Sequence, residues 1–271
     1  MTTFNTEQQY THVCVDGDVL VYWGAFKADY GREEQECASM DFNKVLSPVI
    51  SVLQDLIDNT LCTRLTVYFS DSNRNFRNAI ATLPGPGGQG YKANRKTSKK
   101  PYHYTKIKTW LWDHCTCNVV SCWEADDSAL FNATRIPNSL IVTTDKDLLV
   151  YEWDVYDWTK DVLHRYMPVF ELRNMNKKLY ARGIKWFYAQ MLLGDTGDNI
   201  PGIPKIGPVK AYKLLLEAHT EDEWFEIVKK EYQRHYEFYW KEAMIEIGQL
   251  LWIKQFQCVN IVGHWESEQW V

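Results

Sequence analysis

The chain has 271 residues, of which 45% are apolar and 24% charged, and this is the composition of a globular protein with a sizeable core. Its net charge of −5 gives no global sign of a nucleic-acid partner. No apolar run reaches membrane length and no apolar segment follows a basic start, so we expect a cytoplasmic protein without a membrane partner. The seven cysteines are typical of reduced thiols. His114, Cys115, Cys117 and Cys122 lie close together, but their spacing fits no common zinc motif and favours small buried side chains.

The first half of the chain alternates between short strands and helical segments. Residues 11–16 predict a buried strand that ends in an acid, and Asp16-Gly17-Asp18 predicts a turn. Apolar residues at helical spacing predict a helix over 41–61, where Pro48 either kinks the helix or begins its regular part. Further strands are expected over residues 64–70, 118–122, 139–144 and 152–158. Strands separated by helical segments favour an α/β fold with a mostly parallel central sheet and flanking helices.

The chain is expected to become helical after residue 183. We predict an α/β core over 1–182, a helical region over 183–255, and a C-terminal return to the core over 256–271, with a short strand at 256–262. Within the helical region, one apolar face marks a long helix from Trp240 to Leu251.

Residues 186–216 predict a helix, a glycine turn, a hairpin and a second helix. Asp195 and Asp198 lie in the glycine turn just after the first helix. Exposed backbone amides at the start of a helix bind phosphate, so we expect the hairpin to contact a phosphate backbone. The residues expected to make this contact are Gly202, Lys205, Gly207 and Lys210.

Acidic residues recur where predicted strands end. Ligands of open α/β sheets bind outside the carboxyl ends of the strands. Each acid on its own could be a helix cap or a turn residue. Together, two carboxylates about 4 Å apart repel by roughly 4 kcal/mol at an effective dielectric near 20, so a cluster of them calls for cations. An oxygen-rich cluster favours Mg²⁺ or Mn²⁺. The predicted metal ligands are Asp16, Asp71, Glu124, Asp126, Asp127, Asp145, Asp147, Asp195 and Asp198.

A basic segment over 72–112 contains no acid until Asp113 and carries interleaved aromatic residues. Positive charge follows a phosphate backbone and aromatic faces stack on bases, so DNA contact is favoured over a merely solvated surface. Residues 83–90 predict a flexible glycine-rich loop. A second acid-free basic stretch over 172–193 is expected to hold duplex. The side chains expected to contact DNA in the first segment are Arg74, Arg77, Tyr91, Lys96, Lys99 and Lys100.

Five motifs resemble those of the 5′–3′ exonuclease and flap endonuclease family. Residues 194–199 are similar to its Gly-Asp-x-x-Asp-Asn signature, 124–127 to its Glu-Ala-Asp-Asp motif and 144–147 to its Thr-Asp-x-Asp motif. Asp16-Gly17-Asp18 and the Tyr-Lys-Ala-Asn-Arg-Lys run at 91–96 most resemble the 5′ exonucleases of short-tailed lytic bacteriophages.

The resemblance implies a PIN-like flap nuclease fold with a helix-hairpin-helix and a two-metal phosphodiesterase mechanism. It implies that residues 72–112 form an arch for a single-stranded 5′ end, and that Lys92 and Arg95 act on the scissile phosphate. The Lys205-Ile206-Gly207 run departs from the family's Gly-Ile-Gly, which leaves open whether the hairpin binds K⁺.

The sequence therefore predicts a Mg²⁺-dependent 5′→3′ exonuclease with flap endonuclease or ribonuclease H character. Its expected substrates are 5′ ends, flaps and nicks in DNA, and RNA–DNA hybrid in primers. Two alternatives are a PIN-type ribonuclease for single-stranded RNA, which does not need the hairpin, and a DNA-binding scaffold without metal, which does not need acids at every strand end.

Overall fold

A computed structural model describes residues 10–71, 73–95, 99–165, 168–173 and 178–253. The chain forms two compact units. The first consists of residues 1–75, 98–148 and 153–165, and the second of residues 76–97, 149–152 and 166–271. This division differs from the expected boundary at residue 182, because residues 166–182 belong to the second unit. It also divides the basic segment 72–112 between the two units.

The first unit is built on a six-stranded sheet with the order β5-β2-β1-β6-β7-β8. Neighbouring strands from β5 to β7 are parallel, and β8 runs antiparallel to β7. The mostly parallel sheet predicted from the sequence is thus confirmed. Its strands are β1 (His12–Asp16), β2 (Arg64–Phe69), β5 (Cys117–Val119), β6 (Ser139–Val142), β7 (Val155–Asp157) and β8 (Val162–His164).

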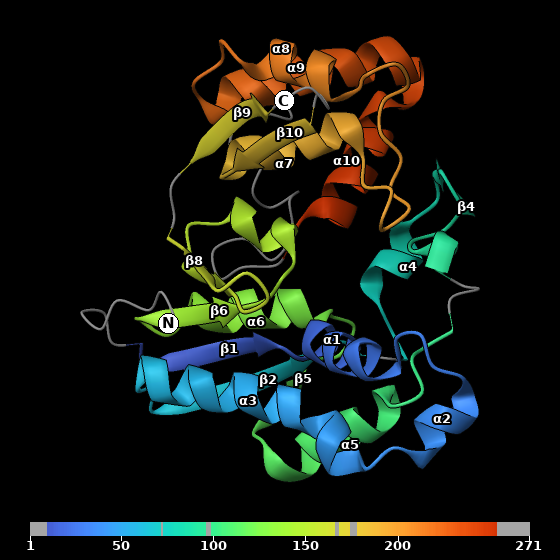
Figure 1. Ribbon diagram of the computed structural model, residues 1–271. Helices are drawn as coiled ribbons and strands as arrows, with labels where there is room; N and C mark the ends of the chain where they lie inside the picture. The colour runs from blue at the N-terminus through green and yellow to red at the C-terminus, as the bar shows by residue number, and fades with distance from the viewer. Residues whose placement is uncertain (1–9, 72, 96–98, 166–167, 174–177, 254–271) are drawn as a thin grey trace. The chain divides into compact units, whose positions relative to one another are not determined.

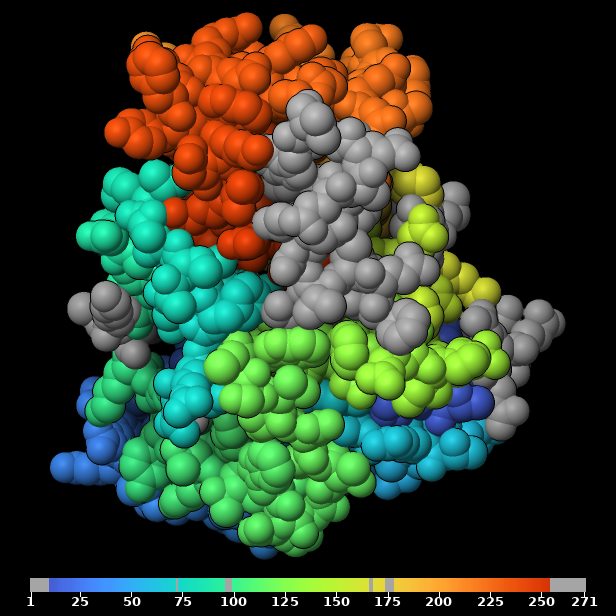
Figure 2. All heavy atoms as spheres, turned by 180° about the vertical axis from the view of Figure 1, so that it is seen from behind, coloured from blue at the N-terminus to red at the C-terminus, as the bar shows by residue number. Residues whose placement is uncertain are grey.

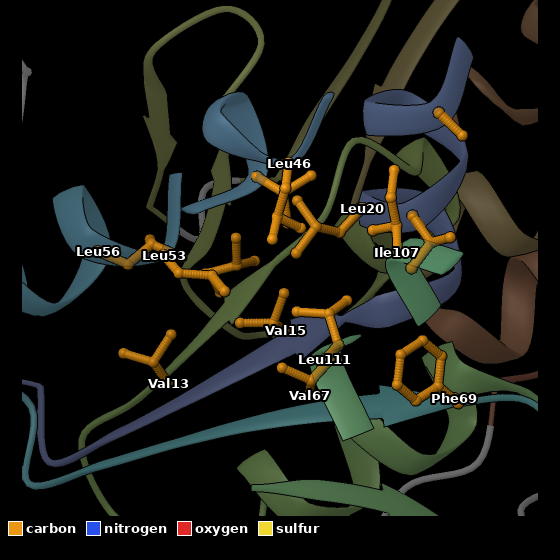
Figure 3. Close-up of a cluster of buried hydrophobic side chains, with 14 of the residues drawn as sticks. Val13, Val15, Leu20, Leu46, Leu53, Leu56, Val67, Phe69, Ile107 and Leu111 are labelled. Carbon is orange, nitrogen blue, oxygen red and sulfur yellow. The ribbon is translucent and has the colours of Figure 1, made fainter. Parts of the chain in front are cut away.

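Helices cover both faces of this sheet (Figure 1). On one face, side chains of three helices pack against β1 and β2 in a continuous apolar core, and Figure 3 shows the cluster from Val13 to Leu111. On the other face lies α6, and the segment around β5 and α6 (green) forms a continuous surface in Figure 2. The helices of this unit are α1 (Gly17–Asp29), α2 (Glu34–Ser39), α3 (Phe42–Thr60), α5 (Tyr104–His114) and α6 (Ala125–Ala133).

The structure corrects one local prediction in the first unit and decides between the two alternatives for Pro48. The chain does not turn at residues 16–18, because Asp16 caps α1 and the helix begins at Gly17. A side chain at Gly17 would lie 2.7 Å from the Tyr68 carbonyl oxygen, so only glycine lets the helix start this close to β2. Pro48 lies inside α3, which begins at Phe42 with Asp41 as its cap, so Pro48 does not begin the regular part of the helix.

The second unit is mainly helical, as expected after residue 183. Helices α7 (Ile184–Leu193) and α8 (Pro208–Leu215) flank the glycine turn and the hairpin. They are followed by α9 (Glu221–Tyr236), the short 3₁₀ helix η3 (Glu237–Tyr239) and α10 (Trp240–Leu251). The C-terminal return predicted over 256–271 lies outside the described residues.

Short elements complete this unit. The antiparallel pair β9 (Val169–Arg173) and β10 (Lys178–Arg182) was not predicted. Helix α4 (Phe76–Ile80) leads to β3 (Pro84–Gly85) and β4 (Gly88–Gln89), which turn the expected loop at 83–90 into a small hairpin. The 3₁₀ helix η1 (Ala93–Arg95) follows, and η2 (Lys146–Val150) links the two units in sequence. In the part of the chain that the structure describes, no helix is both long and apolar enough to cross a membrane.

Candidate active site

The acids of the first unit gather at the carboxyl ends of three adjacent strands. Because β2, β1 and β6 are parallel neighbours, the residues that follow them emerge at the same edge of the sheet. Asp16 is the last residue of β1, Asp71 follows β2 and Asp145 follows β6. These three acids were predicted to lie at the carboxyl ends of strands, and the sheet places them there.

Asp16 is the most constrained of these carboxylates. It is only 3% exposed, accepts a hydrogen bond from the Val19 amide at 3.2 Å and a second from the Thr143 hydroxyl at 3.0 Å. Burial, together with the nearby charges of Asp18 and Asp145, raises the pKa of Asp16 to about 7 against the opposing effect of these hydrogen bonds. A cation beside these three carboxylates would relieve the repulsion.

Asp18 belongs to this group although the sequence analysis did not select it as a ligand. Its Oδ2 accepts the Ser70 amide at 3.0 Å, and its Oδ1 lies 3.6 Å from Lys108 Nζ and 3.4 Å from the Tyr104 hydroxyl. Its position two residues after Asp16 could have indicated that Asp18 lies near the same strand end. We expected a turn at this point, but it is the helix beginning at Gly17 that directs Asp18 toward β2.

The Glu124–Asp127 motif opens α6 as a reciprocal capping box. The Glu124 side chain accepts a backbone N–H of the first turn, and Asp127 Oδ2 accepts the Glu124 amide at 3.1 Å. Asp127 is completely buried, whereas Asp126 is partly exposed and its Oδ1 accepts the Asp127 amide at 2.7 Å. Glu124 and Asp127 therefore act as helix caps. Asp126 is the residue of this motif best placed to reach a ligand.

Asp71, Asp145 and Asp147 also take part in turns. Asp71 accepts the backbone amides of Cys122 and Asn73, each at 3.0 Å, and these hydrogen bonds lower its pKa. Asp145 Oδ1 accepts the Asp147 amide at 2.9 Å. Both Asp71 and Asp145 are partly exposed, so local hydrogen bonding leaves their carboxylates accessible to solvent.

A hard divalent cation fits the chemistry of this edge. The side chains there are carboxylates and hydroxyls, and the pKa of Asp16 is raised by burial and then by the charges of Asp18 and Asp145. Within the described ranges, no three His, Cys, Asp or Glu side chains are already grouped so as to hold a metal ion. The six described cysteines are free thiols.

A second group of predicted site residues lies in the second unit, in the turn after α7. The turn is closed by two backbone hydrogen bonds, from the Asp195 amide to the Ile200 carbonyl at 3.0 Å and from the Ile200 amide to the Asp195 carbonyl at 2.7 Å. Asp195 Oδ1 also accepts the Gly197 amide at 2.7 Å. Gly194, at φ +68°, has the backbone conformation that favours glycine, and this glycine makes the exit from α7 possible.

Asp198 pairs with Lys92 and Arg95, the two basic side chains expected to act on the scissile phosphate. Its carboxylate lies 2.5 Å from Arg95 Nη2 and 3.6 Å from Lys92 Nζ, and it accepts the Tyr91 hydroxyl at 2.7 Å. Lys92 is partly exposed and Arg95 is exposed. The structure thus brings together residues that are about a hundred positions apart in the sequence, and the Asp198 carboxylate serves as their common partner.

Two side chains that were predicted to contact DNA are buried, and the prediction is wrong for both. Arg77 is only 1% exposed, and it donates to the Leu250 and Trp252 carbonyl oxygens at 3.0 and 2.9 Å, so it terminates α10 instead of facing DNA. Tyr91 is 6% exposed and its hydroxyl is bound to Asp198, so its ring is not presented for stacking on a base. A stretch of sequence without acidic residues does not show whether a basic side chain is exposed or caps the end of a buried helix.

The other predicted contacts of the basic segment are solvent-exposed where the structure describes them. Arg74 is exposed, Lys99 forms an exposed ion pair with Glu34 at 2.7 Å, and Lys100 lies 4.5 Å from the Tyr104 ring centre. Lys96 lies outside the described residues.

The hairpin between α7 and α8 exposes the residues that were expected to meet phosphate. Lys205, Gly207 and Lys210 are exposed, and Gly207 caps α8. Lys205 adopts φ +65°, a conformation that favours the glycine found there in the resembling family. A side chain at Gly202 would lie 2.2 Å from the Leu193 carbonyl oxygen, so the hairpin packs against the end of α7 only because this residue is glycine.

The architecture is that of the flap nucleases. A T5 protein crystallised with metal ions matches with a TM-score of 0.54 over 87% of this chain and 88% of that chain, at 17% identity. The bacteriophage T5 flap endonuclease in complex with DNA and metal ions matches with a TM-score of 0.54 over 89% of this chain and 94% of that chain, at 18% identity. The expected PIN-like flap nuclease fold is therefore confirmed.

Curated relatives carry the names that the motifs suggested, although no family model matches the chain. The flap endonuclease Xni of Shewanella piezotolerans is 32% identical over 119 residues, which are 40% of this chain and 43% of that relative. The 5′-3′ exonuclease of Buchnera aphidicola subsp. Schizaphis graminum is 25% identical over 213 residues, or 75% of this chain and 69% of that relative. The first of these matches spans less than half of the relative's length. The resemblance to flap endonucleases and 5′–3′ exonucleases is confirmed by these names.

Proposed function

We propose that this protein is a Mg²⁺-dependent 5′→3′ exonuclease with flap endonuclease or ribonuclease H character. The observation that carries the proposal is the buried carboxylate of Asp16 beside Asp18 and Asp145, at the carboxyl edge of a parallel sheet. A buried carboxylate next to two further carboxylates is unfavourable by itself, and a cation-dependent reaction would explain why it is present. The names of the curated relatives and the fold shared with the T5 nuclease support the same activity.

Carboxylates of the first unit are our proposed ligands of one ion: Asp16, Asp71, Asp126, Asp145, and Glu124, which also caps α6. Asp147 of the first unit, and separately Asp195 and Asp198 of the second unit, are retained as candidates for a second ion. Two Mg²⁺ ions, or Mn²⁺ in their place, would supply an activated water and stabilise the leaving oxygen. Asp127, which is completely buried in the capping box, is the predicted ligand that the geometry supports least.

Lys92 and Arg95 of the second unit are proposed to bind the phosphate that is cut. Both are cations with at least partial exposure, and both are held by Asp198 in the absence of substrate. Fixed positive charge next to a phosphate stabilises the charge that develops during hydrolysis. The exposed Lys205, Gly207 and Lys210 are proposed to contact the phosphate backbone of duplex DNA, with K⁺ at this hairpin an open part of the proposal.

Two other functions remain as alternatives for the experiment. A PIN-type ribonuclease would use the acidic sheet edge, but the hairpin between α7 and α8 favours a duplex-binding enzyme. A scaffold that only binds DNA would have no use for the buried Asp16 carboxylate beside two further carboxylates. We further propose that the enzyme acts in the cytoplasm, on RNA primers or duplex ends during phage replication and recombination.

Labelled nicked duplex, 5′-flap DNA, RNA–DNA hybrid and single-stranded RNA, incubated with and without Mg²⁺, test the proposal. We expect Mg²⁺-dependent release of products from the 5′ strand of the flap and the nick, and no cleavage in excess EDTA, while DNA binding persists. A bulky adduct on the 5′ end should slow cleavage if a free end must thread. Cleavage of single-stranded RNA alone would favour the ribonuclease, and binding without cleavage under any divalent ion would favour the scaffold.

A further inference from the structure

The buried carboxamide of Asn199 joins the turn after α7 to the glycine loop before Tyr91. Asn199 is 3% exposed. Its Nδ2 donates to the Gly88 carbonyl oxygen at 2.9 Å and to the Gly90 carbonyl oxygen at 2.7 Å, and its Oδ1 accepts the Gly87 amide at 2.5 Å. One side chain thereby uses both donors and its acceptor on three backbone groups of a single loop. Only an amide side chain offers this combination.

The backbone at this position also favours asparagine. Asn199 has φ +59°, in the left-handed region that Asn tolerates better than most residues. The loop approaches it so closely that a side chain at Gly85 would lie 1.9 Å from the Asn199 carbonyl oxygen. The contact therefore depends on glycine on one side and on asparagine on the other, and neither partner is readily replaced.

The loop that Asn199 holds leads directly into the residues that we assign to phosphate binding. The Lys92 amide donates to the Asp198 carbonyl oxygen at 2.8 Å, and Arg95 Nε donates to the Gly197 carbonyl oxygen at 2.9 Å. Asn94 Nδ2 donates to the Thr196 carbonyl oxygen at 2.6 Å. The segment from Gly87 to Arg95 is thus fixed along its length to the turn, and Asn199 supplies its first attachment.

We propose that Asn199 is a positioning residue that fixes the Gly87–Gly90 loop and thereby sets the place of Lys92 and Arg95. Asn199 does not touch substrate in this scheme. It acts through the backbone of the loop, and Asp198 completes the alignment by pairing with the two charged ends. This inference rests on the proposed function only for its effect on cleavage. The ordering of the loop is a property of the protein without metal or DNA.

The variant Asn199→Gly tests the proposal, because glycine accepts φ +59° without strain and lacks the side chain that holds the loop. Asn138→Gly is the matched control, since Asn138 has φ +54° and is exposed in the first unit. Amide hydrogen exchange at single-residue resolution is measured in EDTA without DNA. We expect the Lys92 amide, which Asn199 does not contact, to exchange about tenfold faster or more in Asn199→Gly and unchanged in the control.

Single-turnover cleavage of a 5′ flap provides the second measurement. We expect Asn199→Gly to slow cleavage by on the order of a hundredfold while DNA affinity changes little, because misplaced catalytic groups cost rate rather than binding. In a Lys92→Ala, Arg95→Ala background the same substitution should cause almost no further loss. If Asn199→Gly does not give a cooperative melting transition, Asn199→Asp replaces it, because aspartate keeps the size and the acceptor but loses both donors.

Each outcome has a definite meaning. Unchanged exchange at Lys92 would overturn the positioning role, and so would a loss of rate that is as large in the double-alanine background as in the wild type. If the wild-type protein cleaves none of the substrates with any divalent ion, the proposed function fails, while the exchange result still decides whether Asn199 orders the loop.

Discussion

A carboxylate next to a strand or helix end can cap the helix, close a turn or hold a cation, and its surroundings decide among these roles. Asp126 and Asp127 are adjacent, yet Asp127 is completely buried in the α6 capping box and Asp126 is partly exposed. The same short motif therefore carries one residue suited to stability and one suited to a ligand. Sequence alone presents both as equivalent acids.

Asp126→Asn is expected to lower the rate of flap cleavage by at least about a hundredfold, because the amide keeps the shape but not the charge that a metal ligand needs. The free energy of unfolding in EDTA should change by less than about 0.5 kcal/mol, since Asn can still accept the Asp127 amide. The measurements are cleavage rate against Mg²⁺ concentration and melting in EDTA. Asp127→Ala is the comparison and should cost about 1–2 kcal/mol of stability through the lost cap. Normal cleavage by Asp126→Asn would remove Asp126 from the site.

His12 should make the stability of the fold depend on pH. It is 1% exposed in β1, where its Nε2 lies 3.0 Å from the Thr66 hydroxyl oxygen, and burial followed by the charge of Arg64 lowers its pKa from 6.5 to about 4. Below pH 6.5 the unfolded chain takes up a proton that the folded chain refuses. The stability that His12 contributes is thus complete above pH 6.5 and is lost as the pH falls toward 4, by about 3 kcal/mol in all.

Urea unfolding in EDTA from pH 7.5 down to about pH 4 measures this dependence. Other groups titrate in the same range, so the relevant quantity is the difference between the wild type and His12→Asn, whose amide can still bond to Thr66. As the pH falls, the wild type should lose more unfolding free energy than His12→Asn does. Parallel pH profiles for the two proteins would contradict the role assigned to His12.

At the scale of elements, Arg77 explains how the end of α10 is satisfied. The last carbonyl groups of a helix have no partner within the helix and carry its negative dipole end. Arg77, at the start of α4, donates to the Leu250 and Trp252 carbonyl oxygens and so joins two helices that are far apart in the sequence. The buried cation and the helix end stabilise each other.

Arg77→Met should therefore destabilise the protein by about 2–3 kcal/mol, because methionine fills much of the volume but leaves the buried carbonyl groups without the charged donor. Arg74→Ala is the control, since the exposed Arg74 side chain should contribute less than about 0.5 kcal/mol to stability. Thermal melting of both variants measures the difference. Equal melting temperatures would show that the Arg77 contacts contribute nothing.

Local pattern was sufficient for elements that contain a run of apolar residues and insufficient for those that depend on pairing with another segment. The helix over 42–60 and the strands β1, β2 and β6 were predicted because each has several apolar residues in one period. The pair β9 and β10 was missed because charged and apolar residues are mixed in both strands, and their antiparallel pairing with each other is what makes them strands.

For the whole molecule, the net charge of −5 conceals the local separation of acids and bases. DNA binding should depend on the basic stretches alone and therefore on salt. If about six phosphates of a single strand are contacted, log affinity should fall with log salt concentration at a slope of roughly −4. Lys99→Ala should reduce the magnitude of this slope by about 0.7, while Arg77→Met should leave it unchanged because Arg77 is buried.

Fluorescence anisotropy of a labelled oligonucleotide in EDTA, at salt concentrations from about 50 to about 200 mM, gives these slopes without cleavage. A slope near zero would mean that the acid-free segment is only a solvated surface. An equal change of slope in both variants would return Arg77 to the DNA-contacting surface.

The sequence by itself determined the parallel sheet, the acids at its strand ends and the two helices around the hairpin. These features depend on residues close together in the chain, where periodicity and glycine are decisive. Tertiary structure alone decided that Tyr91 and Arg95 bind Asp198 across 107 and 103 positions, that Arg77 is buried, and that Asn199 holds a loop. Such roles depend on which distant segments meet, and that is set by packing of the whole chain, which no local pattern contains.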